Sequence, residues 1–149
     1  MLPAMDEEGK IMMASNHTIK LAPNGNGALF DSLKTDENVQ RAISSFEYVQ
    51  IIGVDNVLNK VMDPVQIGFT HKQQLQTSLK AVSKRAAEEK VGVIGRKNGK
   101  YQVVEYSEFP AMKSGERLAD GNLKFNHGNI LVFVVRSDFL LRLATGNSE

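Results

Sequence analysis

The alternation of apolar and polar positions divides the chain into short strand-like and helix-like segments, and one segment organises the rest. Residues 48–54 are rich in β-branched apolar side chains, a composition that favours a strand buried on both faces. Asp55 and Asn56 follow directly. A carboxylate at the C-terminal end of such a strand lies where open α/β sheets bind ligands, and Asp55 can hold a divalent metal there. The alternative is that Asp55 and Asn56 only cap the strand and start a turn.

Apolar spacing predicts further elements on both sides of this segment. Asn98 and Gly99 separate two apolar runs and predict a hairpin, because both positions of the tightest turns need positive φ. The expected strands are residues 48–54, 78–83, 91–96, 101–106 and 124–135, with a short hairpin at 11–21. The first expected helix starts after Gly27, and the second covers 36–46 with Thr35 as cap. A third starts at Asp63-Pro64, with apolar contacts from Ile67, Phe69 and Leu75, and a fourth covers 138–143 with Ser137 as cap. Residues 107–122 are expected to be a loop.

Strands that alternate with helices favour an α/β fold with a mixed, mainly parallel sheet flanked by helices. The Asn98-Gly99 hairpin adds an antiparallel element to this sheet. The chain has no internal repeat and no linker long enough to separate two domains. Residues 1–149 are therefore expected to form a single domain.

The composition describes an ordinary globular chain, with 42% hydrophobic and 23% charged residues. A formal net charge of +1 gives no electrostatic reason to expect nucleic acid or an anionic membrane as partner. The absence of cysteine excludes disulfides and thiolate metal sites, and no segment approaches the apolar length of a transmembrane helix. The N-terminus is acidic where a signal peptide would be basic, so we expect a cytoplasmic protein.

A loop of glycine and asparagine precedes the first expected helix. Gly25, Asn26 and Gly27 allow positive φ and close approach of the backbone to a bulky group. The N-terminus of the helix that follows is expected to offer unpaired N–H groups to an anion or to the edge of a base.

No other pattern identifies a chemistry by itself. The G-x-x-x-x-G-K-[ST] and G-x-G-x-x-G loops are absent, which removes the main support for an ATPase or a dinucleotide-dependent dehydrogenase. His17, His71 and His127 lack the spacing of metal ligands. Glu105 ends an apolar strand and either forms a local salt bridge or points into a site, and spacing alone favours the salt bridge.

Several short segments, taken in order, closely resemble the eukaryotic UDP-N-acetylglucosamine pyrophosphorylase family. They are P-N-G-N-G at 23–27, V-D-N at 54–56, V-G-V at 91–93, Y-Q-V-V-E-Y-S-E at 101–108 and F-N-H-G-N-I at 125–130, with L-P-A-M at 2–5, D-P at 63–64 and I-G-F at 67–69. The resemblance covers nearly the whole chain. The related UDP-glucose pyrophosphorylases usually lack the N-G-N-G loop and the V-E-Y-S-E run.

The resemblance implies a Rossmann-like nucleotidyltransferase fold and a uridylyltransferase that joins UTP to N-acetylglucosamine 1-phosphate and releases pyrophosphate. It places Gly25, Asn26 and Gly27 against the uridine. It implies that Asp55 lies near the ribose and phosphates as the catalytic residue and helps to hold Mg²⁺, the expected cofactor. It assigns the N-acetylglucosamine to three further residues, namely Gly92, Glu105 and Asn126.

Two residues depart from the family pattern, and several family segments fall outside these positions. Asn24 stands where aspartate is usual, and His127 stands where a small alanine is usual. The family's glycine-rich phosphate loop, a uracil-reading glutamine, a downstream lysine and the C-terminal domain are not present. The chain is therefore expected to be the incomplete central part of a catalytic domain, inactive by itself and of undetermined oligomeric state.

Two alternative functions stay open at this stage. One is a non-catalytic module that binds nucleotide sugars with half of the pocket. The other is a UDP-glucose pyrophosphorylase, which differs in the sugar phosphate that it accepts.

Overall fold

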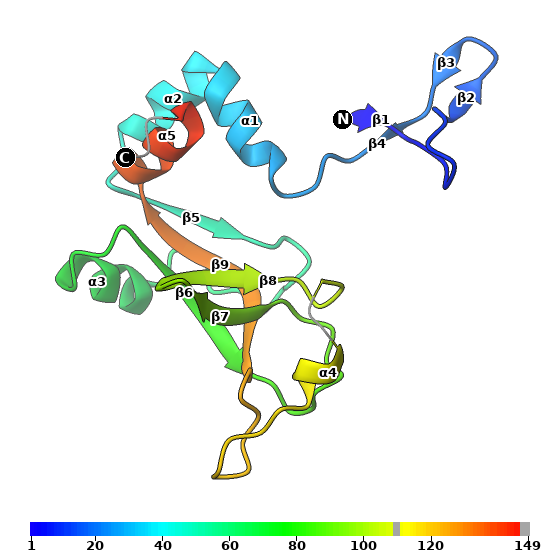
Figure 1. The fold of residues 1–149 in the computed structure, drawn as a ribbon. Coiled ribbons are helices and arrows are strands. Elements are labelled where there is room, and N and C mark those ends of the chain that lie inside the picture. The colour runs from blue at the N-terminus through cyan, green and yellow to red at the C-terminus, as the bar shows by residue number, and fades with distance from the viewer. Residues whose placement is uncertain (109–110, 147–149) are drawn as a thin grey trace. The chain divides into compact units, whose positions relative to one another are not determined.

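The computed structural model describes residues 1–108 and 111–146. The chain divides into two compact units, one of Met1–Ser45 with the residues from Leu140 onward, and one of Phe46–Phe139. We describe each unit by itself (Figure 1). The single domain expected from the sequence stays a prediction.

Unit 1 holds two short strand pairs and a helical part. β1 (Leu2–Pro3) pairs with β4 (Leu21–Ala22), and β2 (Met13–Ser15) pairs with β3 (Thr18–Ile19), which confirms the hairpin expected at 11–21. The helices are α1 (Ala28–Thr35), α2 (Glu37–Ser44) and the C-terminal part of α5 (Ser137–Thr145).

The cap of α2 differs from the prediction by one residue. The Asp36 carboxylate accepts hydrogen bonds from the N–H groups of Asn38 and Val39 at 2.9 and 3.2 Å. The Thr35 hydroxyl instead donates to the carbonyl oxygen of Asp31 at 3.0 Å. The prediction of Thr35 as cap is therefore wrong, because the carboxylate of Asp36 can satisfy two N–H groups at once.

Unit 2 is built around β9 (His127–Arg136), the central strand of a five-stranded sheet. β5 (Tyr48–Ile52) pairs with one edge of β9 and β6 (Thr77–Ser83) with the other, while β7 (Val93–Lys97) meets β9 near its start and pairs with β8 (Lys100–Val104). Val132, Val134 and Val135 of β9 are buried and form much of the core. Figure 1 shows β9 between β5 and β6.

Every strand pair in the described sheets is antiparallel, so the predicted mainly parallel sheet is wrong, although the α/β composition is confirmed. β5 and β6 do run in the same direction, and α3 (Pro64–Lys72) connects them. The strand–helix–strand order that the sequence predicted is therefore present, but β9 lies between the two strands and is antiparallel to both. β5 is consequently an edge strand whose five residues are all half-buried, not buried on both faces as predicted.

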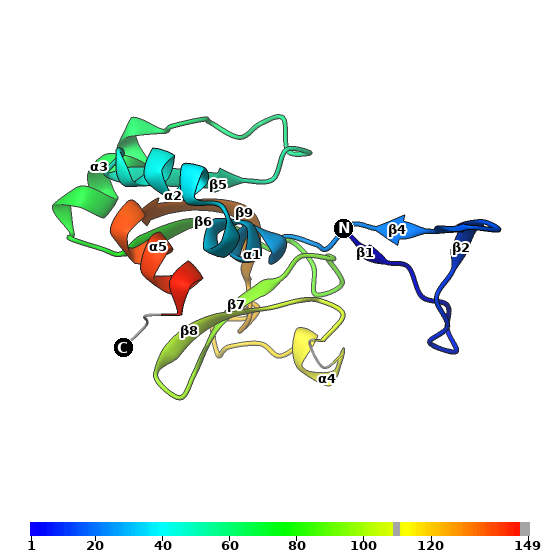
Figure 2. The same ribbon diagram turned by 90° about the horizontal axis from the view of Figure 1, so that it is seen from above.

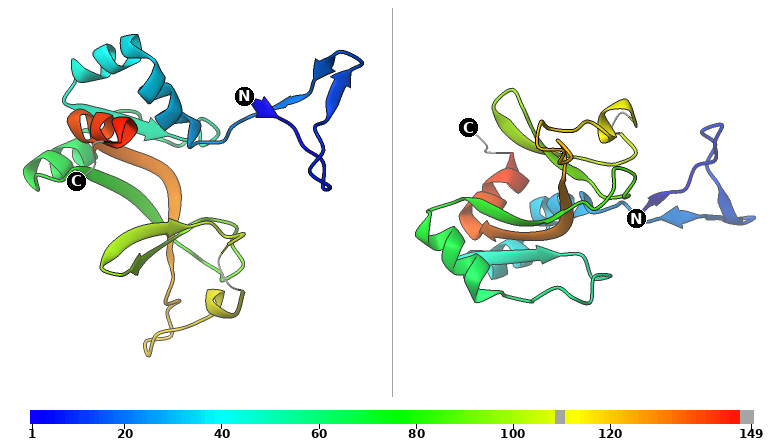
Figure 3. Two further views of the ribbon diagram at one scale, coloured as in Figure 1. Left: turned by 45° about the horizontal axis from the view of Figure 1, so that its top comes forward. Right: turned by 90° about the horizontal axis from the view of Figure 1, so that it is seen from below.

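α3 lies where β5 and β6 begin and β9 ends (Figure 3). It starts at Pro64, as predicted, after the N-cap residue Asp63. The side chains that it buries are the polar Gln66 and Thr70, whereas Phe69 is 57% exposed. Phe69, which was predicted to supply an apolar contact, is therefore mostly exposed.

The remaining elements agree with the sequence in most respects. Asn98 and Gly99 have φ of 52° and 79° and close the β7–β8 hairpin as predicted (Figure 2). The expected loop at 107–122 contains a short helix, α4 (Ala111–Ser114). The hydroxyl of Ser137 is buried without a hydrogen bond to any described residue, so the predicted side-chain cap of α5 is not formed. Within the described ranges, no helix combines the length and apolar character needed to cross a bilayer.

Candidate functional site

Asp55 lies in the turn that follows β5, and its carboxylate is exposed. This carboxylate makes no hydrogen bond or ion pair with another residue in the ranges 1–108 and 111–146. The Asn56 N–H closes this turn by donating to the Gly53 carbonyl oxygen at 3.4 Å, and the Asn56 side-chain oxygen accepts from the N–H of Leu58 at 3.2 Å in the next turn. A Cβ on Gly53 would lie 2.8 Å from the Asp55 Oδ1 atom. Gly53 therefore leaves the space that the Asp55 carboxylate occupies.

Gly92 and Glu105 lie side by side at one end of the β7–β8 hairpin. Gly92 directly precedes β7 and Glu105 directly follows β8, and the pairing of Val93 with Val104 sets them opposite each other. A Cβ on Gly92 would lie 3.2 Å from the Glu105 Oε1 atom. The structure thus brings together two residues that the sequence analysis assigned to one sugar.

The Glu105 carboxylate forms no ion pair with a lysine or arginine of the described chain. The local salt bridge favoured by spacing alone is therefore not seen among these residues. The carboxylate stays available to accept hydrogen bonds, and a carboxylate can accept from two sugar hydroxyls at once.

Asn126 lies just before β9, close to the same end of the hairpin. It is half-buried, and its carbonyl oxygen accepts from the Lys84 N–H at 2.7 Å. Its side-chain amide has no hydrogen bond to a described residue. Two residues later, Gly128 pairs with Val93, and its missing side chain makes room for Val91, whose Cγ2 would lie 2.8 Å from a Cβ there.

β9 connects these groups to Asp55. The Asn129 N–H donates to the Gly92 carbonyl oxygen at 2.8 Å, and the Gly53 N–H donates to the Leu131 carbonyl oxygen at 3.1 Å. Residues two apart on an extended chain are separated by at most about 7 Å. The turn that carries Asp55 and the Gly92–Glu105 pair therefore attach to the same short stretch of β9.

The glycine loop at 25–27 belongs to unit 1 and is described apart from the other residues. Gly25 has the positive φ, 68°, that the sequence analysis expected glycine to allow in this loop. No atom lies within 4 Å of a Cβ on Gly25 or Gly27. The loop is thus open beside its backbone. The N–H groups of Ala28, Leu29 and Phe30 donate within the loop and helix at 3.1–3.3 Å, so the prediction that they are unpaired is wrong.

The predicted Mg²⁺ site rests on Asp55 alone among the described residues. They contain no group of three or more histidine, cysteine or acidic side chains placed to hold a metal. A single exposed and unpaired carboxylate still fits Mg²⁺, which is usually bound by one or two carboxylates together with substrate phosphates and water.

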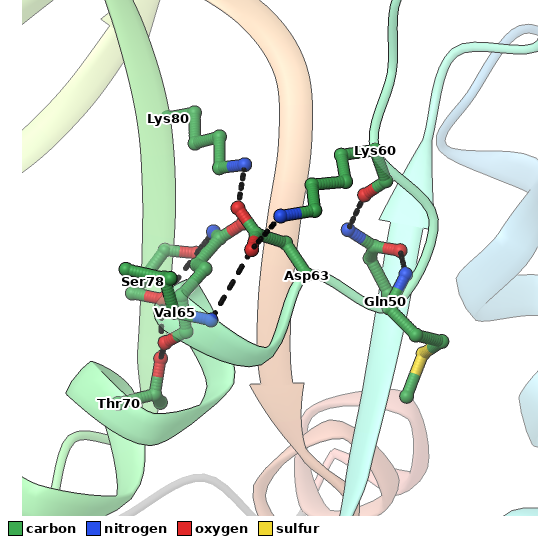
Figure 4. A network of polar contacts seen from close by, with 9 residues as sticks. Gln50, Lys60, Asp63, Val65, Thr70, Ser78 and Lys80 are labelled. Atoms are coloured by element: carbon green, nitrogen blue, oxygen red, sulfur yellow. Dashed lines mark hydrogen bonds and ion pairs between the residues drawn. The ribbon is translucent and has the colours of Figure 1, made fainter.

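An ion-pair network around the buried Asp63, which the sequence analysis missed, holds the far end of the loop that carries Asp55 (Figure 4). The Asp63 carboxylate binds the Nζ atoms of Lys80 and Lys60, the latter at 3.3 Å, and accepts from the Val65 N–H at 3.2 Å. The hydrogen bond from Lys80 is the main cause that lowers the pKa of Asp63 from 3.8 to about 2, against the opposing effect of burial. The lysine between Leu79 and Ala81 of β6 is a signal that could have suggested an ion pair, but it does not indicate Asp63 as the partner.

Comparisons with known proteins agree on one family. The model of a family described as UTP–glucose-1-phosphate uridylyltransferase matches residues 1–142. A mouse UDP-N-acetylhexosamine pyrophosphorylase-like protein 1 is 40% identical over 134 residues, which are 87% of this chain and 26% of that protein. The UDP-N-acetylglucosamine pyrophosphorylase of Saccharomyces cerevisiae is 39% identical over 143 residues, 95% of this chain and 30% of the yeast protein.

A solved structure gives the same result for the fold. The crystal structure of the uridine diphosphate N-acetylglucosamine pyrophosphorylase from Trypanosoma brucei, in complex with an inhibitor, matches with a TM-score of 0.82 and 34% identity. The match covers 98% of this chain and 30% of the trypanosomal chain. This chain therefore spans less than a third of the length of these relatives.

Proposed function

Since this chain belongs to the UTP–glucose-1-phosphate uridylyltransferase family, we propose that it is the sugar- and metal-binding part of an enzyme that makes UDP-N-acetylglucosamine and pyrophosphate from UTP and N-acetylglucosamine 1-phosphate. The names of the relatives support the hexosamine substrate over glucose. No observation favours a non-catalytic module.

The contact between Gly92 and Glu105 carries the proposal. It sets an unpaired carboxylate beside a position without a side chain, at an edge that also holds the free amide of Asn126. Hydroxyls and an acetamido group are ligands that a carboxylate and an amide can bind by hydrogen bonds. The uridine is assigned to the loop at 25–27, where the backbone beside Gly25 and Gly27 is open.

In this reaction a phosphate oxygen of the sugar 1-phosphate attacks the α-phosphorus of UTP in line. The new P–O bond forms as the bond to pyrophosphate breaks, and the leaving group keeps the electron pair. Because no covalent enzyme intermediate is needed, the protein acts by positioning the two substrates and by neutralising charge. Glu105 and Asn126 orient the sugar, and Asp55 would hold Mg²⁺, which lowers the charge of the phosphates. Mg²⁺ and a cytoplasmic location stay predictions of the sequence.

The test uses a polypeptide of the relatives' length that carries these 149 residues, here called the full-length enzyme. Glu105→Ala should raise KM for N-acetylglucosamine 1-phosphate, because the sugar hydroxyls then lack a partner. This loss is worth about 1–3 kcal/mol, or about 5- to 150-fold. KM for UTP should stay unchanged.

Glu108→Ala is the matched control, since it removes an exposed acid three residues further along the chain. Its two Michaelis constants should equal those of the parent. If Glu105→Ala leaves both constants unchanged, Glu105 is not part of the site. A defect confined to UTP would mean that the sugar and nucleotide parts are assigned the wrong way round.

A further inference from the structure

The loop between β5 and α3, residues 53–63, presents Asp55 but is not held by apolar packing against the other described residues. Val54, Leu58 and Val57 are 89–95% exposed. Ordering such a loop costs conformational entropy, and within the described chain the burial of these side chains does not offset that cost. The shape of the loop therefore depends on its hydrogen bonds.

Gln50 of β5 closes the neck of this loop with both ends of its side-chain amide (Figure 4). Its Nε2 atom donates to the Lys60 carbonyl oxygen at 3.2 Å, and its Oε1 atom accepts from the Met62 N–H at 2.6 Å. A glutamine side chain offers a donor and an acceptor together, as this pair of backbone groups requires. Gln50 is itself paired with the buried Val134 of β9, so the returning end of the loop is attached to the middle of the sheet.

The hydrogen bond to Gln50 is made where the backbone is strained. Met62 has φ of 48°, in the left-handed region that residues other than glycine rarely adopt. Such a conformation persists only where the surroundings hold it. Met62 directly precedes Asp63, the N-cap residue of α3, so this conformation turns the chain from the loop into the helix.

Hydrogen bonds inside the loop connect its returning end to the Asp55 turn. The Asn59 side chain donates to the Gly53 carbonyl oxygen at 2.9 Å, and the Asn59 N–H donates to the Asn56 carbonyl oxygen at 3.0 Å. Asn59 directly precedes Lys60, which Gln50 binds. A displacement of the returning end would therefore move the turn that carries Asp55.

We propose that Gln50 is a positioning residue, which fixes the Asp55 carboxylate by binding the returning end of its loop and by holding Met62 in the left-handed conformation. This inference rests on the proposed function for its kinetic consequence, but not for its structural one. Gln50 acts through Asp55 and contacts neither substrate. Its loss should leave the binding of both substrates in place and disturb the alignment of Asp55 with the reacting phosphates.

The kinetic test uses Gln50→Met, which keeps the length of the side chain and removes its donor and acceptor. In the full-length enzyme, Q50M should lower kcat by roughly 10- to 100-fold and leave both KM values within about twofold, since a misplacement of about 1 Å can cost about 100-fold. Unchanged turnover in Q50M would overturn the proposal.

Thr70→Val is the matched control for a general loss of side-chain hydrogen bonds in the same unit. The Thr70 hydroxyl is buried and donates to the Gln66 carbonyl oxygen within α3 at 2.7 Å. T70V should keep the kcat of the parent even where it lowers the melting temperature. A loss of kcat in T70V equal to that in Q50M would overturn the proposal, because turnover would then follow stability alone.

A double-mutant cycle tests whether Gln50 acts through Met62. Glycine adopts positive φ without support. Q50M should therefore reduce kcat much less in a Met62→Gly background than in the parent, which appears as a coupling between the two sites. Equal reductions in both backgrounds would overturn the proposal. The M62G background also supplies a readable Q50M variant if Q50M alone does not fold.

Amide hydrogen exchange at Met62 and Asn59 gives a readout that needs no activity. Exchange at both amides should accelerate in Q50M, because Gln50 holds the loop as a unit, and should stay slow in T70V. Acceleration confined to Met62, or none, would refute the inference even if the enzyme is a pyrophosphorylase. A parent enzyme without uridylyltransferase activity would instead refute the proposed function, and the exchange data would still decide whether Gln50 holds the loop.

Discussion

Asp55 and Glu105 are exposed carboxylates that no described residue pairs with, in contrast to Asp63, which binds two lysines and a backbone N–H. An acid that is already paired must lose its partner before it can bind a ligand. Asp55 and Glu105 avoid this cost, and each is set beside a glycine whose missing side chain leaves space. The pairing of each carboxylate thus distinguishes Asp55 and Glu105, which are suited to binding a ligand, from Asp63, which stabilises the fold.

Asp55→Asn should lower kcat of the full-length enzyme by at least about 100-fold while nucleotide-sugar binding changes little. The reason is that a metal ligand acts on charge that moves during transfer, and such electrostatic contributions are commonly of this size. Turnover is measured across a Mg²⁺ titration, with Asp120→Asn as the control for loss of an exposed carboxylate. Equal turnover of D55N and the parent at all Mg²⁺ concentrations would return Asp55 to a role in the turn.

Gly92→Ala should raise KM for N-acetylglucosamine 1-phosphate about tenfold, because displacement of a binding group by a fraction of an ångström is costly. The added Cβ would lie 3.0 Å from the Val103 Cγ1 atom and 3.2 Å from the Glu105 Oε1 atom, so Glu105 must shift. Gly95→Ala on the same strand is the control, since no atom lies within 4 Å of a Cβ there. Equal effects of the two substitutions would show that the contact with Glu105 does not matter.

At the scale of elements, the loop between β5 and α3 is held at both ends. The Asn59 side chain donates a hydrogen bond to the Gly53 carbonyl oxygen at 2.9 Å. The Gln50 side chain donates to the Lys60 carbonyl oxygen and accepts from the Met62 N–H. Asp63 then caps α3 and binds Lys80 of β6. The loop that presents Asp55 is therefore anchored to the sheet and to the helix.

Asp63→Asn should reduce the acid sensitivity of the folded chain. The pKa of Asp63 is about 2 in the folded protein and 3.8 when unperturbed, so its contribution to stability is full above pH 3.8 and is lost as the pH falls toward 2. Urea unfolding of the 149-residue chain at pH 5 and pH 2 measures this change. D63N should lose less stability than the parent over that interval, and Asp31→Asn should behave like the parent. An equal loss in D63N would exclude Asp63 as the titrating group.

Local sequence patterns predicted most helices and strands, but they could not predict which strands pair with each other. Asn98-Gly99 fixed its hairpin because the turn itself requires positive φ at both positions. The β-branched run of β5 suits any half-buried strand, and nothing in it indicates that β9, about 80 residues later, enters between β5 and β6. For the same reason the sequence did not predict the Asp63–Lys80 pair, whose partners are 17 residues apart.

The candidate site was predicted chiefly from the family resemblance, and the geometry adds what spacing could not. For Glu105, spacing alone favoured a local salt bridge, and the resemblance assigned a sugar contact. The structure supplies the contact with Gly92, which depends on the register of β7 and β8.

On the scale of the whole molecule, the chain covers 26–30% of the mouse and yeast relatives. The 149-residue polypeptide by itself is expected to form no UDP-N-acetylglucosamine. Its sequence does not contain the family's glycine-rich phosphate loop, which would neutralise and orient the triphosphate. A single charged group can be worth roughly 10³-fold or more in such reactions. Product formation by this polypeptide at rates near those of the full-length enzyme would contradict the expectation.

The most direct test of the central claim is the ratio of kcat/KM for N-acetylglucosamine 1-phosphate and glucose 1-phosphate, measured with UTP and the full-length enzyme. A site whose carboxylate and amide bind the acetamido sugar should favour N-acetylglucosamine 1-phosphate by about tenfold or more, since a polar group left unpaired in a site costs at least about 1–3 kcal/mol. Equal use of both sugars would contradict the account, and a preference for glucose 1-phosphate would identify a UDP-glucose pyrophosphorylase.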